Sequence, residues 1–264
     1  RAEQQVQKAR HALEHGVIEL CEGRHARAEK ALLQKIEHAE TPVLNYMAAA
    51  HAAHCQGAYD RRDEYIREAH LAAPEADIAI GLTQAELQMD HDLFEQALAT
   101  LNHLNAQSPQ HPRILKLLAQ VHHRLGDWES LRELLPDLKK TGILDEADMQ
   151  VLETDTWCGL MSDRGNTGDI EVLTRLWEIM PHTMKTLPKV VEYYADELLK
   201  LDAAGEAEKE LRRFLGTNWV ESSVQRYAEL DVMASDEQIS AAEGWLQDHP
   251  YDAHLLFALG RMYI

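Results

Sequence analysis

The residues with the clearest chemical potential form one short segment, His51-Ala-Ala-His54-Cys55. Two imidazoles and a thiol spaced about one helical turn apart are able to hold iron or another soft-to-borderline metal ion. Chance offers a second explanation, because the chain contains 15 His and a nearby pair then arises without any ligation. Cys is also more often a small buried apolar residue than a ligand. His51, His54 and Cys55 are therefore candidate ligands, and we assign no metal ion to the chain.

The sequence lacks the motifs of known enzyme chemistry. It contains no GxSxG, P-loop, HExxH or strand-associated GxGxxG motif. The segment Gly165-Asn-Thr-Gly168 has neither a Lys nor a preceding strand, so we interpret it as a turn rather than a phosphate-binding loop. The many carboxylates on helix surfaces serve solubility rather than acid–base chemistry. We predict that the protein is not an enzyme.

The elements that must position the candidate residues are helical, as the composition indicates. Among 264 residues there are only 13 Gly and 8 Pro, whereas Ala, Leu, Glu and Gln dominate. With 26 Lys+Arg against 45 Asp+Glu, the net charge is −19, which excludes a protein built mainly to bind nucleic acid. The three Cys include no CxxC pair and predict neither a disulfide framework nor a thiolate zinc site. No apolar run reaches the roughly 20 residues that a membrane helix requires.

The same turn signal recurs at four positions, Gly23, Gly57, Asp92 and Gly126. Successive positions are separated by about 34 residues, the period typical of the tetratricopeptide repeat. Each repeat is a pair of antiparallel helices that must stack on its neighbours to bury its apolar face. We therefore predict an all-α fold, an α-solenoid of stacked helical hairpins. Residues 1–143 are expected to form four hairpins, and residues 144–264 divergent helical repeats that end inside a further repeat.

Two further positions support the repeat. The residue two places after the turn is aromatic in three hairpins, at Tyr59, Phe94 and Trp128. The residue five places after the turn is small at Ala28 and Ala97, which permits close approach of the helices, but not at Arg62 or Leu131.

Beyond residue 143 the rhythm weakens. The predicted elements are, in order, a helix over 144–161, a loop over 162–168, a helix over 169–180 and a fifth hairpin around a turn at 202–205. Ser235 gives the N-cap signal of a further helix that ends at Pro250. The last segment, 256–263, matches the first half of another hairpin, so we expect a truncated chain or a disordered tail.

Repeat geometry places the first helix of each hairpin along a concave groove. Helical spacing then defines the candidate groove for a ligand or partner: Leu44, Met47, His51, His54, Cys55, Glu86, Met89, Arg113, Lys116, His123 and Arg124. Further groove positions by the same spacing are Arg10, Leu13, Val17, Leu20, Cys21, Leu82, Asp90 and Gln120. An apolar, sulfur-containing wall would face a basic one. Such a groove suits a flat apolar ligand that bears carboxylates, or an amphipathic peptide with acidic flanks.

Several stretches resemble the HemY family in the same order along the chain. The first is Gly16-Val-Ile-Glu-Leu-Cys-Glu-Gly23 followed by Ala28-Glu-Lys-Ala-Leu-Leu33. Others are Pro42-Val-Leu-Asn-Tyr46, Gly57-Ala-Tyr-Asp-Arg-Arg62, Gly126-Asp-Trp-Glu-Ser-Leu131 and Thr156-Trp-Cys-Gly-Leu-Met161. The similarity covers nearly the whole chain, and the segments around Trp128 and Trp157 discriminate best from generic repeats.

The resemblance implies a role and a location. HemY proteins are inner-membrane tetratricopeptide-repeat proteins of proteobacteria, associated with late protohaem synthesis. The family begins with two membrane helices and a basic stretch that this sequence lacks, so we expect a soluble repeat domain without its N-terminal membrane anchor. The basic stretch would place the repeats on the cytoplasmic face of the bacterial inner membrane.

Three functions stay open. The leading hypothesis is a non-enzymatic scaffold whose implied partners are haem-synthesis enzymes such as ferrochelatase and protoporphyrinogen oxidase. The alternative is a direct haem or porphyrin carrier, with His51, His54 or Cys55 as the haem ligand. The third is a generic peptide-binding adaptor unrelated to haem.

Overall fold

The chain is helical throughout the residues that the computed structural model describes, 2–230 and 236–263, with no strand among them. The α-helices are α1 (Ala2–Cys21), α2 (His25–Leu32), α3 (Pro42–Cys55), α4 (Tyr59–Ala72), α5 (Asp77–Asp90), α6 (Phe94–Gln107), α7 (Pro112–Leu125), α8 (Trp128–Thr141), α9 (Glu146–Gly165), α10 (Ile170–Ile179), α11 (His182–Lys185), α12 (Pro188–Lys200), α13 (Ala204–Leu215), α14 (Glu221–Glu229), α15 (Asp236–Asp248) and α16 (Ala253–Met262). Two 3₁₀ helices, η1 (Ile36–His38) and η2 (Pro74–Ala76), follow α2 and α4.

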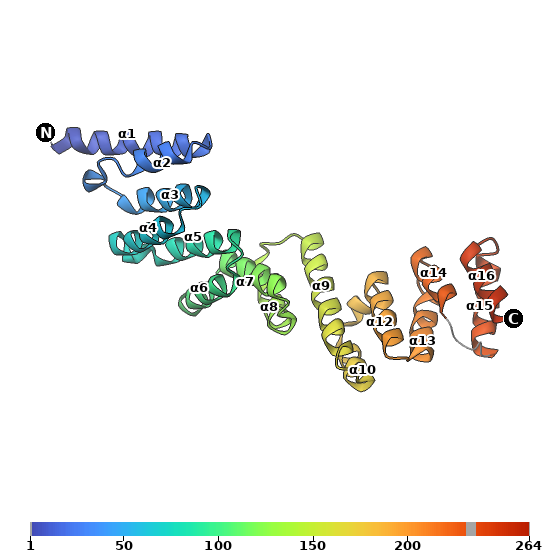
Figure 1. Ribbon diagram of the computed structural model, residues 1–264. Helices are drawn as coiled ribbons and strands as arrows, with labels where there is room; N and C mark the ends of the chain where they lie inside the picture. Colours follow the sequence, from blue (N-terminus) through green and yellow to red (C-terminus); the bar gives the residue numbers. More distant parts are fainter. Residues whose placement is uncertain (1, 231–235, 264) are drawn as a thin grey trace. The chain divides into compact units, whose positions relative to one another are not determined.

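The chain divides into two compact units. Unit 1 consists of Arg1–Leu125 with Lys140–Ile143, and unit 2 of Gly126–Lys139 with Leu144–Ile264. In unit 1 the hairpins α1/α2, α3/α4 and α5/α6 stack in chain order, and α7 packs on α6 (Figure 1). In unit 2 α9 pairs with α10 and α12 with α13, while α12 also packs on α9. Stacked helical hairpins define an α-solenoid, so the predicted fold class is confirmed. The predicted domain boundary at residue 143 stays a prediction.

A residue in the left-handed conformation stands at each predicted turn. The φ angles are +75° at Gly23, +70° at Gly57, +56° at Asp92 and +69° at Gly126. Gly adopts such angles without strain, and Asp more readily than most other residues. Gly168 (φ +74°) follows α9, and Asp202 (φ +56°) follows α12 one repeat period later. The repeat period that weakens in the sequence after residue 143 therefore returns in unit 2. The hairpin predicted around 202–205 is present as α12/α13, although α9/α10 precedes it and α13 already begins at Ala204.

The position five residues after the turn is buried, as expected for a small residue between two helices. Ala28 and Ala97 are fully buried, and so is Ala207, five residues after the turn at Asp202. Arg62, which departs from the pattern, is only 4% exposed. Its guanidinium carbon lies 5.2 Å from the centroid of the Tyr59 ring, so the long side chain is accommodated by lying over an aromatic face.

The two segments that discriminate best from generic repeats meet in unit 2. Trp128, at the start of α8, lies directly against Gly159 in the middle of α9. A Cβ atom at position 159 would lie 2.6 Å from Trp128 Nε1, so only Gly permits this approach. Nearby, Trp177 of α10 stacks on Tyr194 of α12 with ring centroids 4.1 Å apart. These aromatic contacts belong to the core of unit 2.

The predicted loop over 162–168 is wrong in its first half. α9 continues through Gly165, and only residues 166–168 lie outside a helix. A Cβ atom at Gly165 would lie 3.3 Å from Cδ of Glu197 on α12 and closer still to its Oε2. Gly165 therefore serves close packing of two helices rather than reversal of the chain.

The remaining predicted helices have simple outcomes. The helix predicted over 144–161 is present as α9, which continues to Gly165. The helix predicted over 169–180 is present as α10, and α15 ends two residues before Pro250. Ser235, the predicted N-cap, lies outside the described residues. Within 2–230 and 236–263, no helix combines the length and the apolar character needed to cross a bilayer.

Candidate functional site

In unit 1, the first helices of three consecutive hairpins form a concave surface. α3, α5 and α7 line a depression of about 320 Å³ with the side chains of His51, Thr83, Glu86, Leu87, Met89, Asp90, Leu117 and Gln120. Five predicted groove residues are brought together here: His51, Glu86, Met89, Asp90 and Gln120. The prediction lacks Thr83, Leu87 and Leu117, although they lie three residues from Glu86, Asp90 and Gln120 on the same helices. The helical spacing alone was a sufficient signal for them.

Other predicted groove residues lie elsewhere. Leu82 is 6% exposed and belongs to the core, so it does not line a groove. Met47 is half-buried and packs on the cluster around Ala50 and Ile80, whereas Leu44 is 51% exposed. On α1, Leu13 and Leu20 pack against a separate core, while the surface positions are Arg10, Val17 and Cys21.

His51 and Cys55 are neighbours on the exposed side of α3. Cys55 Sγ lies 3.7 Å from His51 Nδ1. Burial raises the pKa of the Cys55 thiol, and the negative charge of Asp90 raises it further. Both effects favour the protonated thiol, which is the less nucleophilic form.

His54 is directed into the junction between the second and third hairpins. Its ring lies edge-on to Tyr59, with centroids 5.9 Å apart, and to His91 at 6.5 Å. Tyr59 and His91 stack on each other at 3.9 Å. Burial lowers the pKa of His54, and the charge of Arg62 lowers it further. His54 is thus a neutral packing residue of the junction, while His51 lines the depression.

The three candidate ligands consequently do not converge. In the described part of the chain, no group of three or more His, Cys, Asp and Glu side chains is placed to hold a metal ion. Toward haem iron the depression offers a single exposed imidazole, that of His51.

The predicted basic wall is compensated by acidic neighbours. Arg113 Nη2 lies 2.6 Å from Glu86 Oε1, and Arg124 Nη2 lies 3.7 Å from Asp92 Oδ1. Arg124 also lies over the Phe94 ring, 5.2 Å from its centroid. Of the other two basic positions, Lys116 and His123 are half-buried, and neither lines the depression. The two arginines are therefore already engaged within the protein.

Asp90 contrasts with these paired groups. Its carboxylate is exposed in the depression and has no ion-pair partner among the described residues. It is also the last residue of α5, whose last turn holds no basic residue. A carboxylate at a helix C-terminus opposes the helix dipole, so Asp90 is locally unfavourable.

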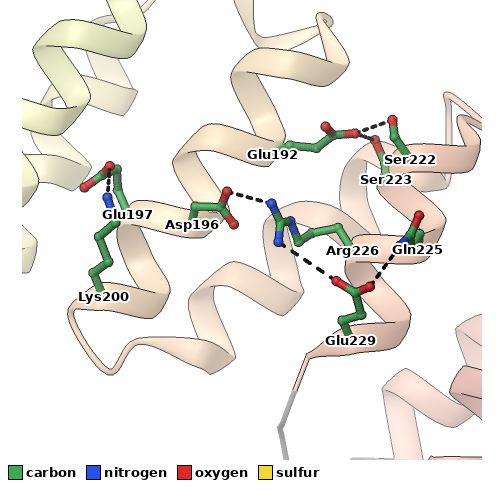
Figure 2. Close-up of polar contacts among 9 residues, drawn as sticks. All are labelled: Glu192, Asp196, Glu197, Lys200, Ser222, Ser223, Gln225, Arg226 and Glu229. Atoms are coloured by element: carbon green, nitrogen blue, oxygen red, sulfur yellow. Dashed lines mark hydrogen bonds and ion pairs between the residues drawn. The ribbon is translucent and has the colours of Figure 1, made fainter.

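Unit 2 contains a polar network that sequence reasoning missed (Figure 2). Glu192 Oε1 on α12 accepts hydrogen bonds from the hydroxyls of Ser222 (2.7 Å) and Ser223 (2.6 Å) on α14. Asp196 Oδ2 accepts a hydrogen bond of 2.8 Å from Arg226. These contacts join residues 30 or 31 apart in the chain, and no local pattern announces them. The network holds α12 against α14.

Comparison with known proteins relates the chain to one family. Residues 1–57 match the family described as HemY protein N-terminus. Protein HemY of Escherichia coli (strain K12) is 29% identical over 195 residues, which are 74% of this chain and 49% of that protein. The predicted resemblance to the HemY family is confirmed. The chain spans about half the length of the curated HemY proteins that it matches.

One solved structure supports the helical fold, and a second is given for comparison. The structure of Naa15/Naa10 bound to HypK-THB matches 96% of this chain and 40% of its own chain, with a TM-score of 0.61 and 18% identity. A tetratricopeptide repeat protein from Parabacteroides merdae ATCC 43184 matches 98% of the chain and 100% of its own, with a TM-score of 0.48 and 13% identity. Because its sequence identity is low, the first of these similarities concerns the helical fold alone.

Proposed function

We propose that the chain is a non-enzymatic scaffold of late protohaem synthesis that holds partner proteins on the concave face of unit 1. The observation that carries the proposal is the depression between α3, α5 and α7, formed by the first helices of consecutive hairpins. The similarity to Protein HemY supplies the haem-synthesis setting. Ferrochelatase and protoporphyrinogen oxidase are the proposed partners.

The proposed location is the cytoplasmic face of the bacterial inner membrane. A scaffold tethered there meets membrane-associated partners at a high effective concentration, which raises apparent affinity without any new contact. Modest groove contacts are then sufficient for assembly.

The test is binding of each purified enzyme to the immobilised chain. Gln120→Arg, which introduces a large cation into the depression, should weaken capture at least about tenfold, since it disturbs both shape and charge. Gln96→Arg is the matched control, because Gln96 is exposed on the second helix α6. Equal capture by both variants, or no capture by the parent chain, would refute the proposal.

Haem or porphyrin carriage is the second candidate, favoured by the exposed imidazole of His51 in the depression. A titration with haem followed at the Soret band should then saturate at one equivalent, and His51→Ala should abolish the shift. A shift that does not saturate at a defined stoichiometry, or that persists in His51→Ala, counts against carriage at this site.

A further inference from the structure

We infer that the depression between α3, α5 and α7 binds a protein segment through a cationic side chain, Lys or Arg, whose charged group pairs with Asp90. The inference deepens the proposed function and rests on it in taking the concave face of unit 1 as the docking surface. It reverses the charge expected from the sequence, where the groove suited a ligand with carboxylates.

The charge of the depression supports a cationic occupant. The described residues that line it include no Lys or Arg, and its ionised groups are Glu86 and Asp90. Arg113 compensates Glu86, whereas Asp90 has no such partner in the described part of the chain. The negative charge of Asp90 acts on two neighbouring groups. It adds to the effect of burial in raising the pKa of Cys55, and it partly offsets the lowering of the pKa of His54. An incoming cation would complete the site.

The shape and lining fit the stem of a long basic side chain. At about 320 Å³, the depression lies at the small end of the range for binding pockets, which is enough to receive one or two side chains. Met89 is half-buried and offers apolar surface for methylene groups, whereas Leu87 and Leu117 are buried beneath the depression. Lys and Arg place their stems on such surface while the charged head reaches a polar edge. Gln120 adds a side-chain carbonyl that can accept a hydrogen bond.

The position of Asp90 is an independent argument. A carboxylate at the last residue of a helix, with no cation in that turn, is unfavourable for the isolated helix. Local choices that oppose stability are expected where a residue serves binding. Asp92, two residues later, is different because it occupies the left-handed turn and approaches Arg124.

Long-range electrostatics point the same way. Unit 1 contains 14 Lys+Arg against 17 Asp+Glu, a net charge of −3, whereas unit 2 contains 12 against 28, a net charge of −16. The whole chain, at −19, therefore attracts basic segments and increases their rate of encounter. The net charge of unit 1 alone is small, so selection of a cation at the depression rests on Asp90.

Fluorescence anisotropy at low ionic strength tests the inference with the full chain. The probes are a fluorescein-labelled amphipathic peptide of Leu, Ala and Gln with one central Arg, and the same peptide with citrulline, the neutral analogue of Arg. The Arg peptide should bind about tenfold more tightly, because charge-assisted hydrogen bonds are roughly twice as strong as neutral ones. Asp90→Asn should remove this preference and should leave thermal stability unchanged or slightly higher. Asp92→Asn, the matched control, should retain the preference.

Equal binding of the two peptides, a preference that survives Asp90→Asn, or failure of the Arg peptide to bind would overturn the inference. These outcomes are separate from the proposed function. Capture of ferrochelatase or protoporphyrinogen oxidase that is insensitive to Asp90→Asn would retain the scaffold and remove the cationic contact. An Arg preference lost in Asp90→Asn, without capture of either enzyme, would retain the contact and remove the proposed partners.

Discussion

The contact between Gly159 and Trp128 provides a sharp test of packing in unit 2. Gly159 lies inside α9, where Ala in place of Gly stabilises an open helix by about 1 kcal/mol. At this position, however, the added methyl group would lie 2.6 Å from Trp128 Nε1 and closer still to two carbons of the indole ring. Real Cβ atoms essentially never approach other atoms to less than 3.0 Å, so the ring or the helix must move.

The expected net effect of Gly159→Ala is destabilisation. Overpacking a core costs about 1–3 kcal/mol. The cost here lies near the upper end, because the added methyl group would clash with several atoms of a rigid indole ring. Subtracting the helix gain of about 1 kcal/mol leaves a loss of about 2 kcal/mol. For a unit of this size, that loss corresponds to a fall in Tm of about 4–8 °C.

Thermal unfolding followed by circular dichroism measures this effect against a matched control. Gly244→Ala makes the same change inside α15, where an added Cβ atom would meet no other atom within 4 Å. That variant should be stabilised by up to about 1 kcal/mol. Introducing Gly159→Ala into a Trp128→Ala background should cost little, because the clash is then absent. If Gly159→Ala melts at or above the parent temperature, the inferred packing of Trp128 on α9 is incorrect.

Two further predictions concern pH. Burial raises the pKa of Glu29, but hydrogen bonds from Arg61, Tyr65 and Gln56 outweigh it and hold the pKa below the usual 4.5. The stability that Glu29 contributes is therefore present above pH 4.5 and lost as pH falls below it. Glu29→Gln should lower the free energy of unfolding by about 1–3 kcal/mol at neutral pH. In urea unfolding, the variant should also show a smaller decrease of this free energy as pH falls below 4.5. For His54, whose pKa lies below 6.5, the neutral form is favoured in the folded chain, so its contribution is present above pH 6.5 and lost as pH falls. His54→Phe should reduce the difference in Tm between about pH 7.5 and pH 5.5, and an unchanged difference would contradict the placement of His54 in the hairpin junction.

Much of the fold was predictable because its determinants are local. A turn residue with positive φ, such as Gly23 or Gly57, depends only on its own backbone, and its regular recurrence is visible in the sequence. A buried small residue five places later, such as Ala28, follows from the same register. Gly168 also has a positive φ at a turn, but it lies more than one repeat period after Gly126. This irregular spacing hid the turn from a search for a regular repeat.

The candidate site was predictable only in part. Helical spacing placed His51, Glu86 and Met89 on one concave surface, and the depression contains all three. Helical spacing also grouped His54 with His51, whereas the structure directs His54 to Tyr59 and His91 across the hairpin junction. The helix itself determines the direction in which a side chain points, but the residues that the side chain contacts come from the next repeat.

The sequence by itself determined the helical class and the hairpin turns, because these depend on backbone preferences and on spacing within a few helical turns. Tertiary structure alone decided the charge of the concave face and the glycine contacts. Arg113 on α7 is neutralised by Glu86 on α5, and Gly159 on α9 receives Trp128 from α8. Electrostatic compensation and close packing are properties of pairs, and only the stacking of repeats determines which residues form a pair.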